Sequence, residues 1–183
     1  MISSALAALT ATTGNKTDCW NTPPDFVGDV IKFFGTIDLD PCSNDENNPN
    51  VPATKVYTEE TNGLAHKWIA AIVFMNHPYS DSKTWVHYDV SQYELGYAKE
   101  LILLIKLDVS TRWWKSVSQY PWLAVNRRRK FGDGRGAAPF QSAVVYLGKD
   151  LDRFNDVFGK YGTLYVPHRN LSHDMQTNLS KLL

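Results

Sequence analysis

The sequence has few cysteines and no excess of charge of either sign, and each absence excludes a class of protein. Only Cys19 and Cys42 occur, and they form no CxxC motif. Two cysteines at this spacing predict no disulfide framework. They indicate a reducing compartment, in which the thiols act as small buried hydrophobic groups. The 19 basic and 19 acidic residues give a formal net charge of zero. No global field therefore attracts the chain to nucleic acid or membrane, and such a partner must meet a local patch.

Long hydrophobic runs and metal motifs are also missing. No apolar stretch reaches the length of a membrane span, and residues 1–16 lack the charged start and compact apolar run of a signal peptide. We therefore expect a cytoplasmic protein. The chain has no HExxH motif, no Cys/His metal spacing and no nucleophile elbow, so we expect no metal.

Composition and patterning indicate one α/β domain. The 183 residues are 43% hydrophobic, enough for a sizeable core. We expect a flexible N-terminal segment at 1–17, one domain at 18–168 and a C-terminal tail at 169–183. Expected strands lie at 36–39, 55–58, 69–75, 101–107, 122–125, 142–147 and 163–166. They alternate with expected helices at 22–34, 83–99, 111–117 and 151–158, the first capped by Thr22 and the third by Ser110. This order predicts a doubly wound, mostly parallel sheet with an antiparallel end.

Two expected strands end in polar residues. The apolar run 69–75 stops at Asn76-His77-Pro78-Tyr79, and the strand at 36–39 leads into Asp40-Pro41-Cys42-Ser43. In open α/β sheets, ligands bind outside the carboxyl ends of such strands. Read alone, each ending is equally typical of an ordinary turn.

Taken in order, these segments resemble the phage and prophage DNA adenine-N6 methyltransferase family (the Dam-like group). The likeness covers roughly residues 20–147. It rests on Thr22-Pro23-Pro24, Asp40-Pro41-Cys42-Ser43, Asn62-Gly63-Leu64 with Trp68, Asn76-His77-Pro78-Tyr79-Ser80, Arg129-Lys130-Phe131 and Pro139-Phe140-Gln141-Ser142-Ala143.

The resemblance implies a Rossmann-like methyltransferase fold that transfers a methyl group from S-adenosylmethionine to the N6 amine of adenine in double-stranded DNA, in the host cytoplasm if a phage encodes it. Asp40, Pro41 and Cys42 would line the methionine part of the cofactor, and Thr22 and Pro23 would close the same pocket. Glu59 would accept the ribose hydroxyls, with Glu60 an equal candidate.

The resemblance makes Asn76, His77, Pro78 and Tyr79 the catalytic turn. The lone pair of an aromatic amine is delocalised into its ring, so the site must hold the amine with acceptors that favour a tetrahedral nitrogen. The Asn76 side-chain oxygen and the carbonyl of residue 77 would supply two acceptors. Tyr79 would offer a flat face for a base flipped from the duplex.

His77 departs from the family, which has proline there, and Asn62 stands where the family often has aspartate. Any residue at position 77 supplies the same backbone carbonyl. A proline, however, would stiffen the loop, whereas histidine adds a titratable ring beside the base pocket. One alternative is therefore a catalytically impaired, methyltransferase-like DNA-binding or anti-restriction protein. The same turn also suits methyltransferases that act on cytosine N4 or on a glutamine amide.

A basic run supplies the local patch that the net charge does not. Arg127, Arg128, Arg129 and Lys130 precede the glycine-rich segment 132–136, which contains Arg135. Such a run is usually a solvated surface, but glycines let a backbone approach phosphates closely. We expect these five cations to bind DNA. The recognition sequence and the oligomeric state do not follow from the sequence.

Overall fold

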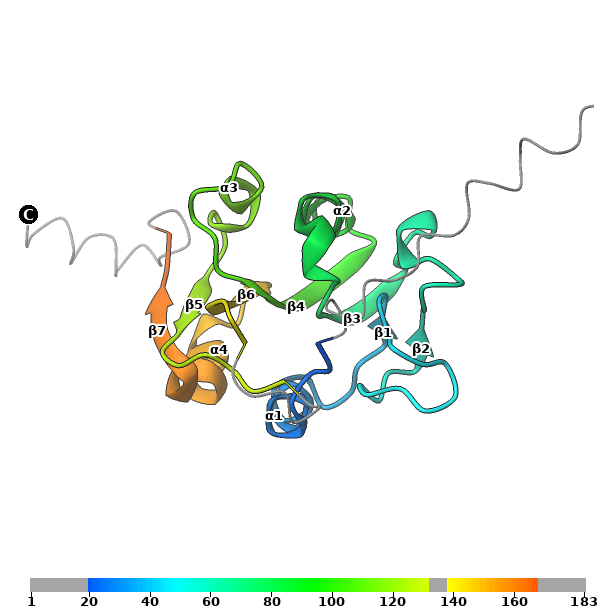
Figure 1. The fold of residues 1–183 in the computed structure, drawn as a ribbon, viewed down its shortest axis with the longest axis horizontal. Helices are drawn as coiled ribbons and strands as arrows, with labels where there is room; N and C mark the ends of the chain where they lie inside the picture. The colour runs from blue at the N-terminus through cyan, green and yellow to red at the C-terminus, as the bar shows by residue number, and fades with distance from the viewer. Residues whose placement is uncertain (1–19, 132–137, 168–183) are drawn as a thin grey trace, which may run out of the picture.

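The computed structural model describes residues 20–131 and 138–167, so the expected segment 1–17 and tail 169–183 lie outside the described residues. One seven-stranded sheet has the order β2-β1-β3-β4-β6-β5-β7 (Figure 1). Its first four strands pair in parallel: β1 (Leu39–Asp40), β2 (Lys55–Val56), β3 (Ala70–Met75) and β4 (Ala98–Lys106). The remaining pairings are antiparallel and involve β5 (Trp122–Val125), β6 (Ser142–Leu147) and β7 (Gly162–Tyr165).

Helices cover both faces of this sheet, which confirms the predicted fold class. Helices α1 (Pro24–Phe34) and α4 (Leu151–Phe158) lie on one face, and α2 (Ser82–Glu94) and α3 (Trp114–Val117) on the other (Figure 1). In β4, Ile102 and Leu104 belong to the core under α1 and α4, whereas Leu101, Leu103 and Ile105 belong to the core under α2. A segment buried on both faces has to be apolar throughout, which is why 73–75 of β3 and 101–105 of β4 are continuous hydrophobic runs.

Three local expectations were wrong. The helix expected at 83–99 ends at Glu94, because Gly96 turns the chain with a φ of 73° before β4 begins. No side chain caps α1; its N-cap residue is Pro23, not Thr22. The helix expected at 111–117 is only Trp114–Val117, and the Ser110 hydroxyl donates to the Asp108 carboxylate instead of capping it.

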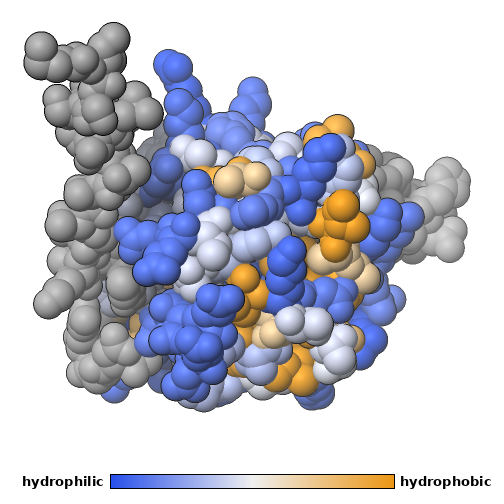
Figure 2. All heavy atoms as spheres, turned by 90° about the vertical axis from the view of Figure 1, so that its right-hand side faces the viewer, coloured by the Kyte–Doolittle hydropathy of each residue, from blue (hydrophilic) through white to orange (hydrophobic). Residues whose placement is uncertain are grey.

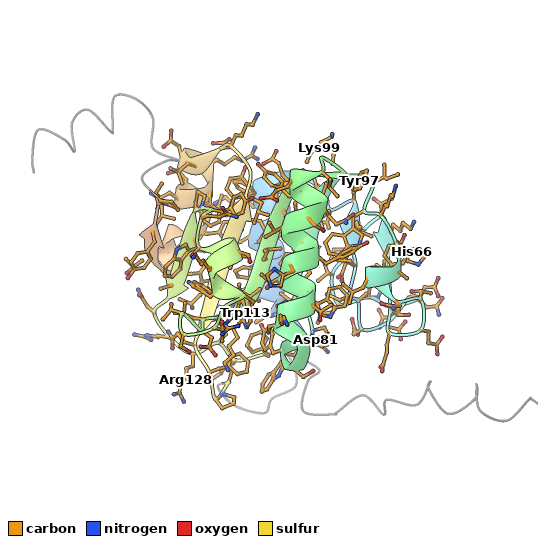
Figure 3. The ribbon with its side chains drawn as sticks, turned by 90° about the horizontal axis from the view of Figure 1, so that it is seen from above. His66, Asp81, Tyr97, Lys99, Trp113 and Arg128 are labelled. Atoms are coloured by element: carbon orange, nitrogen blue, oxygen red, sulfur yellow. The ribbon has the colours of Figure 1, made fainter. Side chains whose placement is uncertain are left out.

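The sheet order brings the two polar strand ends together. Leu39 of β1 lies opposite Val73 of β3, so Asp40 and Asn76 leave the sheet at the same edge. Figure 3 shows Asp81, which follows the β3 end, and Arg128 at one end of the molecule, whereas Tyr97 and Lys99 lie at the other. The two strand endings that the sequence predicted as sites, at Asp40 and at Asn76, therefore both lie at the carboxyl end of the parallel strands.

The face beside β2 and β1 is mainly hydrophilic, with apolar patches between the polar groups (Figure 2). Within residues 20–131 and 138–167, no helix is long and apolar enough to cross a membrane. The same residues contain no group of three or more His, Cys, Asp or Glu side chains that could hold a metal ion.

Candidate active site

A small cavity of about 40 Å³ lies at the carboxyl ends of β1 and β3. Four residues that the sequence predicted as functional meet there: Thr22, Asp40, Cys42 and Asn76. The other lining residues were not predicted, and they are Trp20, Asn21, Asn44, Asn50, Val51 and Phe74.

Asp40 is a buried carboxyl group with few polar neighbours. It is 4% exposed, and its Oδ1 accepts from the backbone nitrogen of Cys42 at 3.1 Å. Burial raises the pKa of Asp40 to about 7, against hydrogen bonds from Cys42 and Ser43 that lower it. Cys42 is half-buried, and burial, with the Asp40 charge beside it, raises the pKa of its thiol well above its usual value.

The side-chain amide of Asn76 is held at all of its polar positions. Its Nδ2 donates to the Trp20 carbonyl at 2.6 Å and to the Thr22 hydroxyl at 3.0 Å. Its Oδ1 accepts from the Tyr79 hydroxyl at 2.9 Å. Because both N–H groups have acceptors from the segment before α1, the amide oxygen is turned toward Tyr79.

His77 is a buried residue whose ring contacts that of Tyr79 edge-on, at 5.5 Å between ring centroids. The side chain is 2% exposed, with Nδ1 3.2 Å from the Met75 sulfur. Burial lowers the pKa of His77 to about 3, so the ring is neutral at physiological pH. The expectation that this ring titrates near neutral pH was therefore wrong, whereas its place beside the base pocket stays a prediction.

The turn is held by contacts that do not require a proline at position 77. The Asp81 backbone nitrogen donates to the Pro78 carbonyl at 3.2 Å. The Ser82 hydroxyl donates to the Tyr79 carbonyl at 3.0 Å. Together with the Tyr79 contact to Asn76, these bonds fix the turn from its C-terminal side.

Aromatic side chains from distant segments surround the Tyr79 ring. Phe140 lies edge-on to it at 4.8 Å between ring centroids, and Phe131 at 6.2 Å. Trp20 contacts the same two rings, at 5.4 Å from Phe131 and 5.2 Å from Phe140. Phe131 and Phe140 flank the glycine-rich segment. Their position beside its two ends is the feature of the sequence that could have predicted this aromatic cluster around Tyr79.

Three further predicted residues lie outside the cavity lining. Pro23 begins α1, its carbonyl accepting from the Phe26 and Val27 nitrogens at 3.0 Å each. Pro41 is buried against Gly63, where an added Cβ would lie 2.0 Å from the Pro41 oxygen, so only glycine fits there. Glu59 and Glu60 occupy an exposed turn after β2. The cofactor role of Glu59 stays a prediction.

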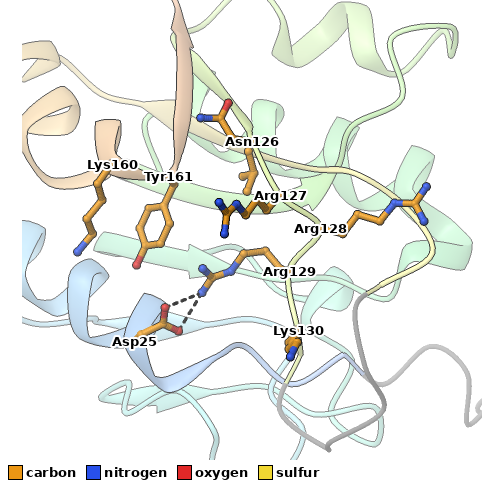
Figure 4. Close-up of a pocket in the computed structure, with 9 residues that line it drawn as sticks. Asp25, Asn126, Arg127, Arg128, Arg129, Lys130, Lys160 and Tyr161 are labelled. Atoms are coloured by element: carbon orange, nitrogen blue, oxygen red, sulfur yellow. Dashed lines mark hydrogen bonds and ion pairs between the residues drawn. The ribbon is translucent and has the colours of Figure 1, made fainter.

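The basic run lines a second, larger cavity of about 710 Å³ beside the start of α1 (Figure 4). Arg127, Arg128 and Lys130 are exposed. Arg129 differs from them: its guanidinium donates to both Asp25 carboxylate oxygens, at 2.8 and 3.0 Å, and lies 4.9 Å over the Tyr161 ring. Arg129 thus fastens the loop to α1, and Arg135 lies outside the described residues.

The chemistry of the smaller cavity suits a cationic ligand. A buried carboxyl group and the Asn44 and Asn50 amides supply oxygen acceptors there. Within residues 20–131 and 138–167, no cation is among the groups that set the Asp40 pKa, and a sulfonium or ammonium group would stabilise this carboxylate. The space holds about one water molecule, so only one end of a cofactor fits inside it.

Comparison with known proteins agrees with this geometry. The family model described as DNA N-6-adenine-methyltransferase (Dam) matches residues 9–123. That range contains the small cavity and ends before the basic run. A relative named DNA N-6-adenine-methyltransferase, from Haemophilus phage HP1 (strain HP1c1), is 32% identical over 98 residues, which are 53% of this chain and 54% of the relative. The chain therefore spans about half the length of this curated relative.

The match to the family model covers more than half of the chain and includes both strand ends that form the cavity. The fold, the order of the polar segments and the matched residues agree. The chain belongs to the DNA N-6-adenine-methyltransferase (Dam) family.

Proposed function

We propose that this protein transfers the methyl group of S-adenosylmethionine to the N6 amine of adenine in double-stranded DNA. The observation that carries the proposal is the meeting of Thr22, Asp40 and Asn76 in one cavity, in a chain of this family. If a phage encodes the protein, the reaction would take place in the host cytoplasm.

The cofactor would lie with a positively charged end at Asp40, between Thr22 and Cys42. When bound, it supplies an electrophilic methyl group on a sulfonium. The carboxylate would stabilise the positive charge and orient the methyl group toward the β3 end. Asn44 and Asn50, which line the same cavity, are further acceptors for polar groups of the cofactor.

Asn76 and the His77 carbonyl would hold the adenine amine. The Asn76 Oδ1 already accepts from Tyr79 and has a second lone pair for an N6 hydrogen. Both acceptors would draw the amine hydrogens out of the ring plane. The lone pair is then localised on the nitrogen and is no longer delocalised into the ring. The new C–N bond forms as the C–S bond breaks, and one N6 proton then passes to solvent.

The exposed cations of the larger cavity would bind the DNA backbone. Arg127, Arg128 and Lys130 have no described carboxylate partner. They lie at the same end of the molecule as the catalytic turn, as the Arg128 label in Figure 3 shows. Phosphate contacts there would fix the position of the duplex without reading its sequence.

The test is transfer of tritium from labelled cofactor into DNA, with nucleoside mass spectrometry to identify the product. N6-methyladenine is expected, and Asn76→Ala should reduce its formation by a factor of about 100 or more while sparing cofactor affinity. Cofactor binding without N6-methyladenine on any DNA would overturn the proposal. N4-methylcytosine or a methylated glutamine as the product would identify one of the alternative acceptors.

A further inference from the structure

The segment before α1 contacts the catalytic asparagine directly, although 54 positions separate Thr22 from Asn76. The Thr22 hydroxyl oxygen accepts one hydrogen bond from the Asn76 Nδ2 and the Trp20 carbonyl accepts another. Thr22 is 3% exposed, and the Asn50 amide donates to its backbone carbonyl at 2.9 Å. Burial and the hydrogen bond from Asn50 thus hold the Thr22 residue, and with it the hydroxyl, in place.

From this geometry we infer that Thr22 is a positioning residue for Asn76, and not only a wall of the cofactor pocket. This inference rests on the proposed function. A primary amide can turn over about its terminal torsion, which would exchange its oxygen and nitrogen. With both N–H groups donated to Trp20 and Thr22, the turned form would place the amide oxygen against the Trp20 carbonyl. The observed orientation keeps Oδ1 on the side where the target amine is held.

The same hydroxyl also connects the amide to the cofactor cavity. An oxygen that accepts from Asn76 still carries its own hydrogen, and Thr22 lines the cavity. When the hydroxyl donates to an acceptor of the cofactor, its oxygen becomes a better acceptor for the amide N–H. The amide is then polarised further, and its Oδ1 becomes a stronger acceptor for the adenine amine. Cofactor binding would in this way strengthen the hold on the base.

Two substitutions at this position separate the roles. Thr22→Val keeps the shape of the side chain and removes the hydroxyl, and Thr22→Ser keeps the hydroxyl. We expect Thr22→Val to lower kcat by about tenfold, the effect of one hydrogen bond, and to raise cofactor Kd by a smaller factor. Thr22→Ser should retain most of the activity. Thr36→Val, on the exposed turn after α1, is the matched control.

A structural readout makes the test independent of turnover. In the ¹⁵N-labelled full chain, the two Asn76 side-chain N–H resonances should move in Thr22→Val and stay in Thr22→Ser and Thr36→Val. Unmoved resonances in Thr22→Val would overturn the inference, even if the wild type methylates no DNA. An unchanged kcat with a raised cofactor Kd would also overturn it, because Thr22 would then act on the cofactor alone. A wild type without activity, but with the expected resonance shifts, would reject the proposed function and leave the amide contact supported.

Discussion

The small cavity at the ends of β1 and β3 and the basic cavity beside α1 are constructed in opposite ways. The first is lined by buried and half-buried groups whose hydrogen bonds are made within the protein, as for Asp40 and Asn76. The second is wide, and most of its cations are exposed. Chemistry on one amine needs a fixed and dry geometry, whereas phosphates along a flexible duplex are met best by long, solvated side chains.

The largest effect is expected from Asp40→Asn, which removes the buried charge and keeps the shape. Losing one partner of a buried charge pair should weaken S-adenosylmethionine binding by a factor of about 100, measured by calorimetry at pH 8. The melting temperature should not fall, because the amide has no charge to desolvate. Unchanged affinity would show that the cofactor does not contact Asp40.

The basic cavity should respond through salt dependence. The triple variant Arg127→Ala, Arg128→Ala, Lys130→Ala should bind duplex DNA tens of times more weakly at about 0.1 M salt, with a log–log salt slope reduced by about three. Fluorescence anisotropy at several salt concentrations measures both quantities. Cofactor affinity serves as the control and should stay constant. An unaltered slope would place the DNA on another surface.

Cofactor affinity should depend on pH through Asp40. The carboxyl is protonated below a pKa of about 7, and a cationic ligand favours the deprotonated form. Binding must therefore release a proton at low pH, and affinity should fall about tenfold from pH 7.5 to pH 6. In Asp40→Asn this dependence should disappear. His77, with a pKa of about 3, contributes nothing in this range.

Arg129→Ala should affect stability and not the salt slope. Its guanidinium is 15% exposed and is paired with Asp25, which is 63% exposed, so solvent screens much of the pair. We expect the free energy of unfolding to fall by about 1 kcal/mol in urea titrations. Asp25→Ala should have the same effect. A slope reduced by about one would instead make Arg129 a phosphate contact like its neighbours.

The smallest effect concerns Asp89, a fully buried residue of α2 whose two carboxylate oxygens have no hydrogen-bond partner. Burial raises the pKa of Asp89 well above 3.8, so folding keeps a proton that the unfolded chain releases. Stability therefore falls as pH rises above about 4. Asp89→Asn should stabilise the protein by about 1 kcal/mol at pH 8 and by less at pH 5. A larger gain at pH 5 would contradict this sign.

The elements and strand ends could be predicted, because burial on both faces leaves a continuous apolar pattern in β3 and β4. Contacts between distant segments could not. Trp20 lies 56 positions from Asn76, and Arg129 lies 104 positions from Asp25. In the sequence, Arg129 is one of four equivalent cations. Only the fold shows that it has an internal partner, and only the fold shows that the His77 ring is buried.

The antiparallel pairing of β5 and β6 has an evolutionary consequence. Ala124 and Ala143 are register partners, so the chain between them leaves the sheet and returns at one place. A change of charge at Arg127, Arg128 or Lys130 alters only exposed side chains of that excursion and leaves the parallel strands, with Asp40 and Asn76 at their ends, in the same positions. Selection can therefore change the charge of this surface while the residues at the strand ends are inherited unchanged.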